Sequence, residues 1–260
     1  MKRMLVTLAA VIIATLQIAG AQTVEKTYDI VDFHGVSISD GFDVVLEHTD
    51  GFKVAVEVTE DFLPYVKVEN RGGVLELSID RLPFNLKQKN RTKVAKATIG
   101  LPTLTYVSMS GATNLTSNDQ FANTMERFVM KVAGGSKVSN IVIKSPFADI
   151  DLSGASKVTA SFRSSDIFIR LSGASRLDLT GEASEMEVEA LGASKLLADE
   201  FPVDEIEARA SGASTVEVRP VKALRVDLSG ASRCIYYGGD DDLKVNAERV
   251  SGGSKVKHHR

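Results

Sequence analysis

Eight copies of a Gly-Ala-Ser-type tetrapeptide recur in the second half of the chain, and they limit its possible folds more than any other feature. The copies begin at Gly111, Gly134, Gly154, Gly173, Gly192, Gly212, Gly230 and Gly252. Their first glycines are separated by 23, 20, 19, 19, 20, 18 and 22 residues. A repeat of about twenty residues with a small-residue corner in each copy is typical of a solenoid, in which each turn stacks on the preceding one.

Apolar residues stand at three fixed positions relative to each glycine: two before it, four before it and four after it. Around Gly154 these residues are Leu152, Ile150 and Val158, and the one exception in these columns is Glu248. Alternating apolar positions indicate β-strands with one face turned inward. The pattern predicts an all-β fold, a right-handed parallel β-helix over residues 105–260, with two or three short strands per rung. At the spacing of stacked strands, seven intervals give a column roughly 34 Å long.

Residues 22–104 carry no tetrapeptide but show the alternation of half-buried strands. Asp50-Gly51 and Asn70-Arg71-Gly72-Gly73 separate apolar runs, and such turns favour β-hairpins because glycine accepts positive φ. We therefore expect a small antiparallel β meander that precedes the solenoid and caps its first rung, whose edge would otherwise be exposed.

Residues 1–21 have the features of a signal peptide. Lys2 and Arg3 precede an apolar run over residues 5–18, and Ala19-Gly20-Ala21 forms a cleavage site. The exported chain would begin at Gln22. We expect a location in the periplasm or at the cell surface or outer membrane of a Gram-negative bacterium, with no transmembrane segment after cleavage.

Charge and cysteine content narrow the classes of partner. Without Lys2 and Arg3 the chain has 29 basic and 34 acidic residues, a net charge of −5. An excess of acidic residues gives no indication of nucleic-acid binding, which requires a basic surface. The single cysteine, Cys234, occupies an inward column and is expected to be a small buried apolar residue. No motif indicates a metal or another cofactor.

Three residues before each glycine, the sign of the charge alternates along the repeats. Stacking would place opposite charges next to one another, which is favourable between neighbouring strands. We interpret this column as a structural charge ladder that fixes register, with each basic residue in reach of both neighbouring acids. The alternative is a pair of carboxylates in a glycosidase cleft. The ladder consists of Lys131, Asp151, Arg170, Glu189, Arg209, Asp227 and Arg249.

Three residues after each glycine, the column is basic and contains no acid. Its cations either extend into solvent from the corner or form an anion-binding ridge for acidic glycans or lipid head groups. The serines of the tetrapeptides are assigned to backbone hydrogen bonds, because no general base recurs beside them and a nucleophile needs one. No catalytic residue is predicted. The candidate binding residues are Lys137, Lys157, Arg176, Lys195, Arg233 and Lys255.

An ordered set of motifs resembles the bacterial putative auto-transporter adhesin head domain, also called the head GIN domain. The set comprises Phe33-His34-Gly35-Val36, Gly73-Val74-Leu75-Glu76-Leu77, Ile99-Gly100-Leu101-Pro102, the serial Ser-Gly-Ala-Ser copies and Tyr237-Gly238-Gly239. Leu191 departs from the pattern, since serine usually precedes the glycine. The resemblance implies an exported β-helical protein of the surface or periplasm, and it implies no catalytic residues.

The sequence therefore predicts an exported, non-enzymatic β-solenoid that provides a rigid interaction or adhesion surface at the cell envelope. Its expected partners are an acidic glycan, a lipid head group or another envelope protein. Two alternatives stay open: a polysaccharide-active lyase or hydrolase built on a β-helix, and a scaffold that binds envelope proteins. An enzyme should interrupt the repeat at one rung to install an acid–base pair, and here the repeat persists.

Overall fold

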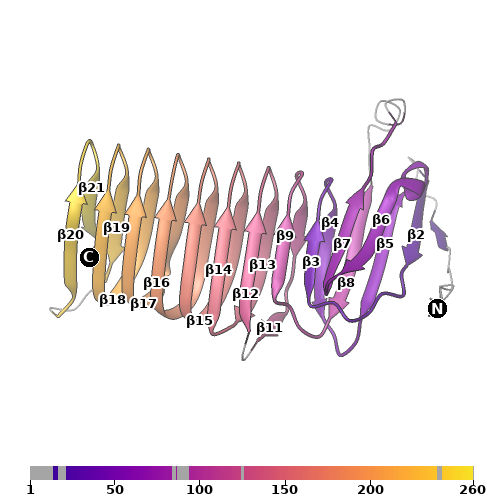
Figure 1. Ribbon diagram of the computed structural model, residues 1–260, viewed down its shortest axis with the longest axis horizontal. Helices are drawn as coiled ribbons and strands as arrows, with labels where there is room; N and C mark the ends of the chain where they lie inside the picture. The colour runs from indigo at the N-terminus through magenta and orange to yellow at the C-terminus, as the bar shows by residue number, and fades with distance from the viewer. Residues whose placement is uncertain are drawn as a thin grey trace, which may run out of the picture.

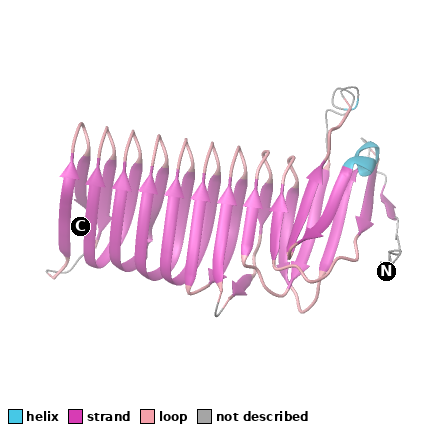
Figure 2. Cartoon of the chain, viewed as in Figure 1, coloured by secondary structure: helices cyan, strands magenta, loops and turns pink. Residues whose placement is uncertain are grey.

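The computed structural model describes residues 14–16, 22–83, 86, 94–123, 126–238 and 242–259, and nearly all of them are β-strand or tight turn (Figure 2). A short 3-10 helix, η1 (Glu60–Tyr65), follows the fifth strand. No helix in these ranges has the length and apolar character needed to cross a membrane. Of the predicted signal peptide, only strand β1 (Ala14–Leu16) belongs to the described residues, so its cleavage stays a prediction.

The N-terminal region contributes eight strands, one of which lies in the predicted signal peptide. After β1 they are β2 (Thr23–Thr27), β3 (Gly35–Ile38), β4 (Asp43–His48), β5 (Lys53–Thr59), β6 (Val66–Arg71), β7 (Val74–Ile79) and β8 (Ala95–Leu101).

The repeat region contributes the remaining strands, which stack in one regular column (Figure 1). The shorter ones are β9 (Tyr106–Met109), β10 (Asn114–Thr116), β11 (Gln120–Ala122), β12 (Arg127–Val132), β13 (Lys137–Lys144), β14 (Phe147–Leu152), β19 (Arg233–Tyr237), β20 (Lys244–Val250) and β21 (Lys255–His259). The longer ones are β15 (Lys157–Leu171), β16 (Arg176–Ala190), β17 (Lys195–Ala210) and β18 (Thr215–Leu228). The predicted parallel β-solenoid is confirmed.

Each rung has two strand segments, which belong to two sheets facing each other across the core. The N-terminal half of β15 pairs with β13, whereas its C-terminal half pairs with β14. We call the sheet that contains β9, β12, β14, β20 and the C-terminal halves of β15–β18 the first sheet. The second sheet contains β10, β13, β19, β21 and the N-terminal halves of β15–β18. Because the long strands bend from one sheet into the other, the rungs are continuous.

The glycine corner holds all the tetrapeptides on one side of the solenoid, as predicted. The first glycine of every copy has φ between 66° and 78°. The backbone N–H of Ala155 donates to the carbonyl oxygen of Gly134 at 2.7 Å, and the same bond recurs in later rungs, for example from Ala193 to Gly173. Gly154 and Gly192 therefore lie in one continuous stack.

The predicted inward columns form the core. Ile150, Leu152 and Val158 are at most 1% exposed, and the other rungs repeat this burial except the last, where Val250 is 44% exposed. Glu248 has no partner in β18, because the pairing of β18 with β20 shifts by one residue between Val226 and Asp227. Glu248 is the inserted residue, and its carboxylate pairs with Arg225 at 3.0 Å. The exception in the inward pattern is thus a β-bulge.

The N-terminal region departs from the predicted antiparallel meander. Strands β3 and β4 form a solenoid rung that stacks directly below β9 and β10, in parallel register (Val36↔Val107 and Val44↔Leu115). Strands β7 and β8 add another parallel rung beneath it. Antiparallel pairing is confined to β1–β2, β2–β5, β5–β8 and β6–β7, at the N-terminal end of the column. Alternation marks strands without specifying their direction, so it does not distinguish these parallel rungs from an antiparallel meander.

The two predicted hairpins have opposite outcomes. Gly72 and Gly73, with φ of 60° and 83°, join the antiparallel strands β6 and β7, so this hairpin is confirmed. The hairpin at Asp50-Gly51 is wrong, because β8 lies between β4 and β5 and pairs with both.

Candidate functional site

The basic column predicted from the sequence runs along the outer face of the second sheet, beside the glycine corner. Lys137, Lys157, Arg176 and Lys195 are paired in consecutive parallel strands. Thr215 interrupts the column, which continues through Arg233 and Lys255. We call these six basic residues the basic ridge.

Two members of the basic ridge are neutralised within the molecule. The Nε atom of Arg176 donates to both carboxylate oxygens of Asp178 at 2.8 and 3.1 Å, and Lys195 pairs with Glu217 at 3.1 Å. The other four, Lys137, Lys157, Arg233 and Lys255, are exposed and form no ion pair with any residue that the structure describes. The ridge therefore presents two pairs of free cations on adjacent rungs.

The charge ladder forms a single column on the outer face of the first sheet, but its pairs are loose. The distances are 3.8 Å for Arg170–Asp151, 4.0 Å for Arg209–Glu189 and 3.9 Å for Arg249–Asp227. Arg170 makes no pair with Glu189 within 4.0 Å, contrary to expectation, and its guanidinium lies 4.8 Å from the centre of the Phe168 ring.

Arg209 makes its close contacts with residues outside the ladder column. Its Nη1 atom lies 2.5 Å from a carboxylate oxygen of Glu187, and its Nη2 atom donates to Glu207. The hydrogen bond that Arg209 donates to Glu187 raises the pKa of Arg209. The principal ion pairing of this face thus lies one column away from the predicted ladder.

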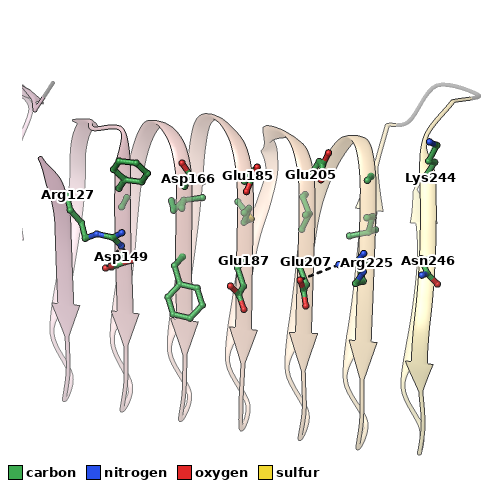
Figure 3. A pocket seen from close by; sticks show the side chains of 18 residues that line it. Arg127, Asp149, Asp166, Glu185, Glu187, Glu205, Glu207, Arg225, Lys244 and Asn246 are labelled. Atoms are coloured by element: carbon green, nitrogen blue, oxygen red, sulfur yellow. Dashed lines mark hydrogen bonds and ion pairs between the residues drawn. The ribbon is translucent and has the colours of Figure 1, made fainter. Parts of the chain in front are cut away.

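A groove of about 460 Å³ follows the solenoid axis on the outer face of the first sheet (Figure 3). It crosses β12, β14–β18 and β20, and its side chains stand five and seven residues before the corner in most rungs. We call it the acidic groove, because six carboxylates line it: Asp149, Asp166, Glu185, Glu187, Glu205 and Glu207.

Three of these carboxylates are neutralised by arginine. Asp149 accepts two hydrogen bonds of 2.8 Å from Arg127, and Glu207 lies 3.6 Å from Arg225 in addition to its contact with Arg209. Glu187, as described above, also binds Arg209.

The other three carboxylates form a column without a close ion pair among the described residues, although the charge of Glu205 acts on Lys222. Asp166, Glu185 and Glu205 occupy matching positions in β15, β16 and β17. Among the described residues, none of their side chains has an ion pair or a hydrogen bond. Like charges on neighbouring strands repel one another, so this column would be stabilised by an external cation.

The acidic groove was missed by the sequence analysis, although its signal is present. The alignment on the glycines also contains the positions five and seven residues before them, and Asp166, Glu185 and Glu205 all stand seven before a glycine. The predicted charge columns are those three residues before and three residues after the glycines, where the charges alternate in sign or are basic.

The serine column is structural, as predicted. Ser175, Ser194, Ser214 and Ser232 are 1% exposed, and their hydroxyls donate to backbone carbonyls of the preceding rungs. Cys234 is fully buried, and burial raises the pKa of its thiol to about 12. The described residues contain no group of His, Cys, Asp and Glu side chains suited to hold a metal ion.

These features define a class: a two-sheet parallel β-solenoid with one acidic groove and one basic ridge on opposite outer faces. The model of the putative auto-transporter adhesin head GIN domain family matches residues 32–239, and the chain belongs to this family. The predicted resemblance is therefore confirmed. No curated protein sequence matches the chain.

Solved structures share the fold at low sequence identity. A putative adhesin from Parabacteroides distasonis has a TM-score of 0.82 and 18% identity, over 92% of this chain and 98% of its own. A putative adhesin from Parabacteroides merdae has a TM-score of 0.77 and 17% sequence identity, and the match covers 93% of this chain and 97% of its own. A structure named putative lipid binding protein, from Parabacteroides distasonis, has a TM-score of 0.78 and 14% sequence identity. The match covers 93% of this chain and 98% of its own.

Proposed function

We propose that the protein is an exported, non-enzymatic β-solenoid that acts as a rigid interaction and adhesion module at the cell envelope. The observation that carries the proposal is the basic ridge, whose free cations Lys137, Lys157, Arg233 and Lys255 are aligned along one side of the column. A solenoid in which each rung is hydrogen-bonded to the next holds such side chains at fixed spacing. Membership of an adhesin family supports the same interpretation.

The chemistry of the ridge indicates a partner with repeated negative charges. Acidic glycans and the head groups of anionic phospholipids both provide them, and ammonium and guanidinium groups bind carboxylate, sulfate and phosphate. A lipid source has additional support in the name of one structure of the same fold, a putative lipid binding protein.

Two anionic probes test this proposal and distinguish the sources. Binding of the exported chain is measured to dextran sulfate and to vesicles that contain an anionic phospholipid. We expect binding to at least one probe at low salt, and a loss of about tenfold or more when Lys137→Glu and Lys157→Glu are combined. The control is Lys53→Glu with Lys67→Glu, which changes the net charge equally at N-terminal strands. Absence of binding to both probes, or equal losses in the two double variants, would contradict the proposal.

A polysaccharide-active enzyme is the second candidate, and the acidic groove is the observation that favours it. Glycoside hydrolysis uses two carboxyl groups, and the groove contains several. Incubation with acidic and neutral polysaccharides, followed by measurement of reducing ends, tests this function. We expect no product. Product that disappears in Glu185→Gln would show that the groove is catalytic.

A further inference from the structure

We propose that the acidic groove of one copy of this chain binds the basic ridge of a second copy, so that the solenoids associate side by side. The inference rests on the proposed function, because it uses the ridge as the anion-binding element and names one of its partners. The anionic surface that fits the ridge is then the groove of another copy.

The two columns have the same repeat distance. Asp166, Glu185 and Glu205 step by one strand of the first sheet each time, and Lys137 and Lys157 step by one strand of the second sheet. Both sheets consist of the same parallel rungs, about 4.8 Å apart. A pair of free ridge cations laid along a groove therefore meets one opposite charge per rung over two adjacent rungs. A ligand with another repeat would lose this register.

The three groove carboxylates and the two ridge lysines form no close ion pairs inside the described part of the molecule. No described residue forms an ion pair within 4.0 Å with Asp166, Glu185 or Glu205, although the charge of Glu205 acts on Lys222, and none pairs with Lys137 or Lys157. In each column, like charges face one another on adjacent strands, which is unfavourable in the isolated molecule. Contact between a groove and a ridge would relieve both repulsions at once.

The N-terminal end of the groove adds a surface that accepts cations. Phe147 is 42% exposed there, and the guanidinium of Arg127 lies 5.5 Å from the centre of its ring. Figure 3 shows Arg127 extending toward Asp149 at this end. Phe147 is paired with Asp166 in the neighbouring strand, so a lysine from a second copy that reaches the Asp166 carboxylate would also approach an aromatic side chain, an arrangement that stabilises cations.

The placement of the two surfaces determines the form of the assembly. The groove lies on the outer face of the first sheet and the ridge on the outer face of the second, and the shared core separates them. One contact leaves the second surface of each copy free, so the association is heterologous and continues instead of closing at a dimer. The net charge of −5 of the exported chain opposes this association only weakly.

Sedimentation velocity of the exported chain tests the inference. Exposed ion pairs are individually weak, so we expect species larger than the monomer to grow with protein concentration at about 10 mM salt and to disappear at about 0.5 M. A wild-type protein that stays monomeric at high concentration and low salt would overturn the inference.

Two charge-reversed proteins give the sharper test. One carries Glu185→Lys with Glu205→Lys in the groove, and the other carries Lys137→Glu with Lys157→Glu in the ridge. All four side chains are exposed, so both proteins should fold like wild type. Each alone should be monomeric, because its groove and ridge then have the same sign. An equimolar mixture should associate again, since each groove meets a ridge of opposite charge.

The mixture and the binding probes separate this inference from the proposed function. A mixture that stays monomeric would overturn self-association. The groove-reversed protein keeps its ridge and should still bind dextran sulfate or anionic vesicles. A wild type that binds these probes but never associates would leave the proposed function standing and refute the second copy as a partner. Monomeric wild type that binds poly-lysine through the groove would assign the groove a different occupant.

Discussion

Gly173 lies directly against Gly154 in the glycine corner: a Cβ atom on Gly173 would stand 2.6 Å from the carbonyl oxygen of Gly154. That oxygen accepts the N–H of Ala174 at 2.7 Å, so it cannot move away without loss of the bond between rungs. The φ of Gly173 is also +72°, a value that side chains of L-residues disfavour. The corner thus requires glycine for both its conformation and its close approach.

Substitution Gly173→Ala should destabilise the fold by at least about 1–3 kcal/mol, because it combines backbone strain with a clash against the neighbouring rung. Urea unfolding followed by circular dichroism measures the change. The matched control is Gly135→Ala, where a Cβ atom would meet nothing nearer than the Cβ of Ala112 at 4.0 Å. Equal stabilities of these two variants would disprove the packing argument for the corner.

The serine column allows a paired comparison of buried hydroxyls. Ser232 donates to the carbonyl oxygens of Ser229 at 2.9 Å and Ala210 at 3.2 Å, whereas the Oγ atom of Ser156 has no partner. We expect Ser232→Ala to cost about 1 kcal/mol and Ser156→Ala to be neutral or stabilising, because an unsatisfied buried hydroxyl is unfavourable. Thermal unfolding of both variants tests this order, and a larger loss in Ser156→Ala would reverse the interpretation.

On the outer face of the first sheet, Arg209 should matter more for stability than Arg170. Arg209 contacts Glu187 and Glu207 closely, whereas Arg170 has one loose pair with Asp151. At low salt we expect Arg209→Glu to cost about 1–2 kcal/mol and Arg170→Glu less than about 1 kcal/mol, with both losses smaller at high salt. If Arg170→Glu were the more damaging variant in chemical denaturation, the predicted ladder would be the main charge network after all.

Cys234 should respond to pH in a defined direction. Burial raises the pKa of its thiol from 9.0 to about 12, so the folded state keeps a proton that the unfolded state loses. This contribution to stability is fully present below pH 9 and is lost as the pH rises from 9 toward 12. Native protein should also react with a thiol reagent far more slowly than unfolded protein. Equal labelling rates would show that the thiol is accessible.

The repeat region was predictable because one residue type fixes its geometry. Each corner needs positive φ and close approach, so glycine recurs and reveals the period, and the inward columns follow from it. Alternation alone then gives the strands and the core. The charge columns were visible in the same alignment, but their partners depend on side-chain conformation. The spacing of residues along the repeats does not determine that Arg209 pairs with Glu187.

The rung formed by β3 and β4 was not predictable from the repeat, because its corner does not have the Gly-Ala-Ser sequence. Ser39-Asp40-Gly41-Phe42 stacks beneath the first tetrapeptide, with positive φ at Asp40 and Gly41. Phe42 takes the place of the buried serine, and 71 residues separate Val36 from its partner Val107. Because β5–β8 lie between these two rungs in the sequence, a search for a fixed repeat length does not find this pairing.

Cell fractionation, combined with the mass of the recovered chain, tests whether this interaction module acts at the cell envelope. We predict recovery in the periplasmic or outer-membrane fraction with an N-terminus at Gln22, as expected after removal of residues 1–21. Recovery of the intact chain with Met1 in the cytoplasm would contradict the claim, because the basic ridge would then never meet an envelope surface.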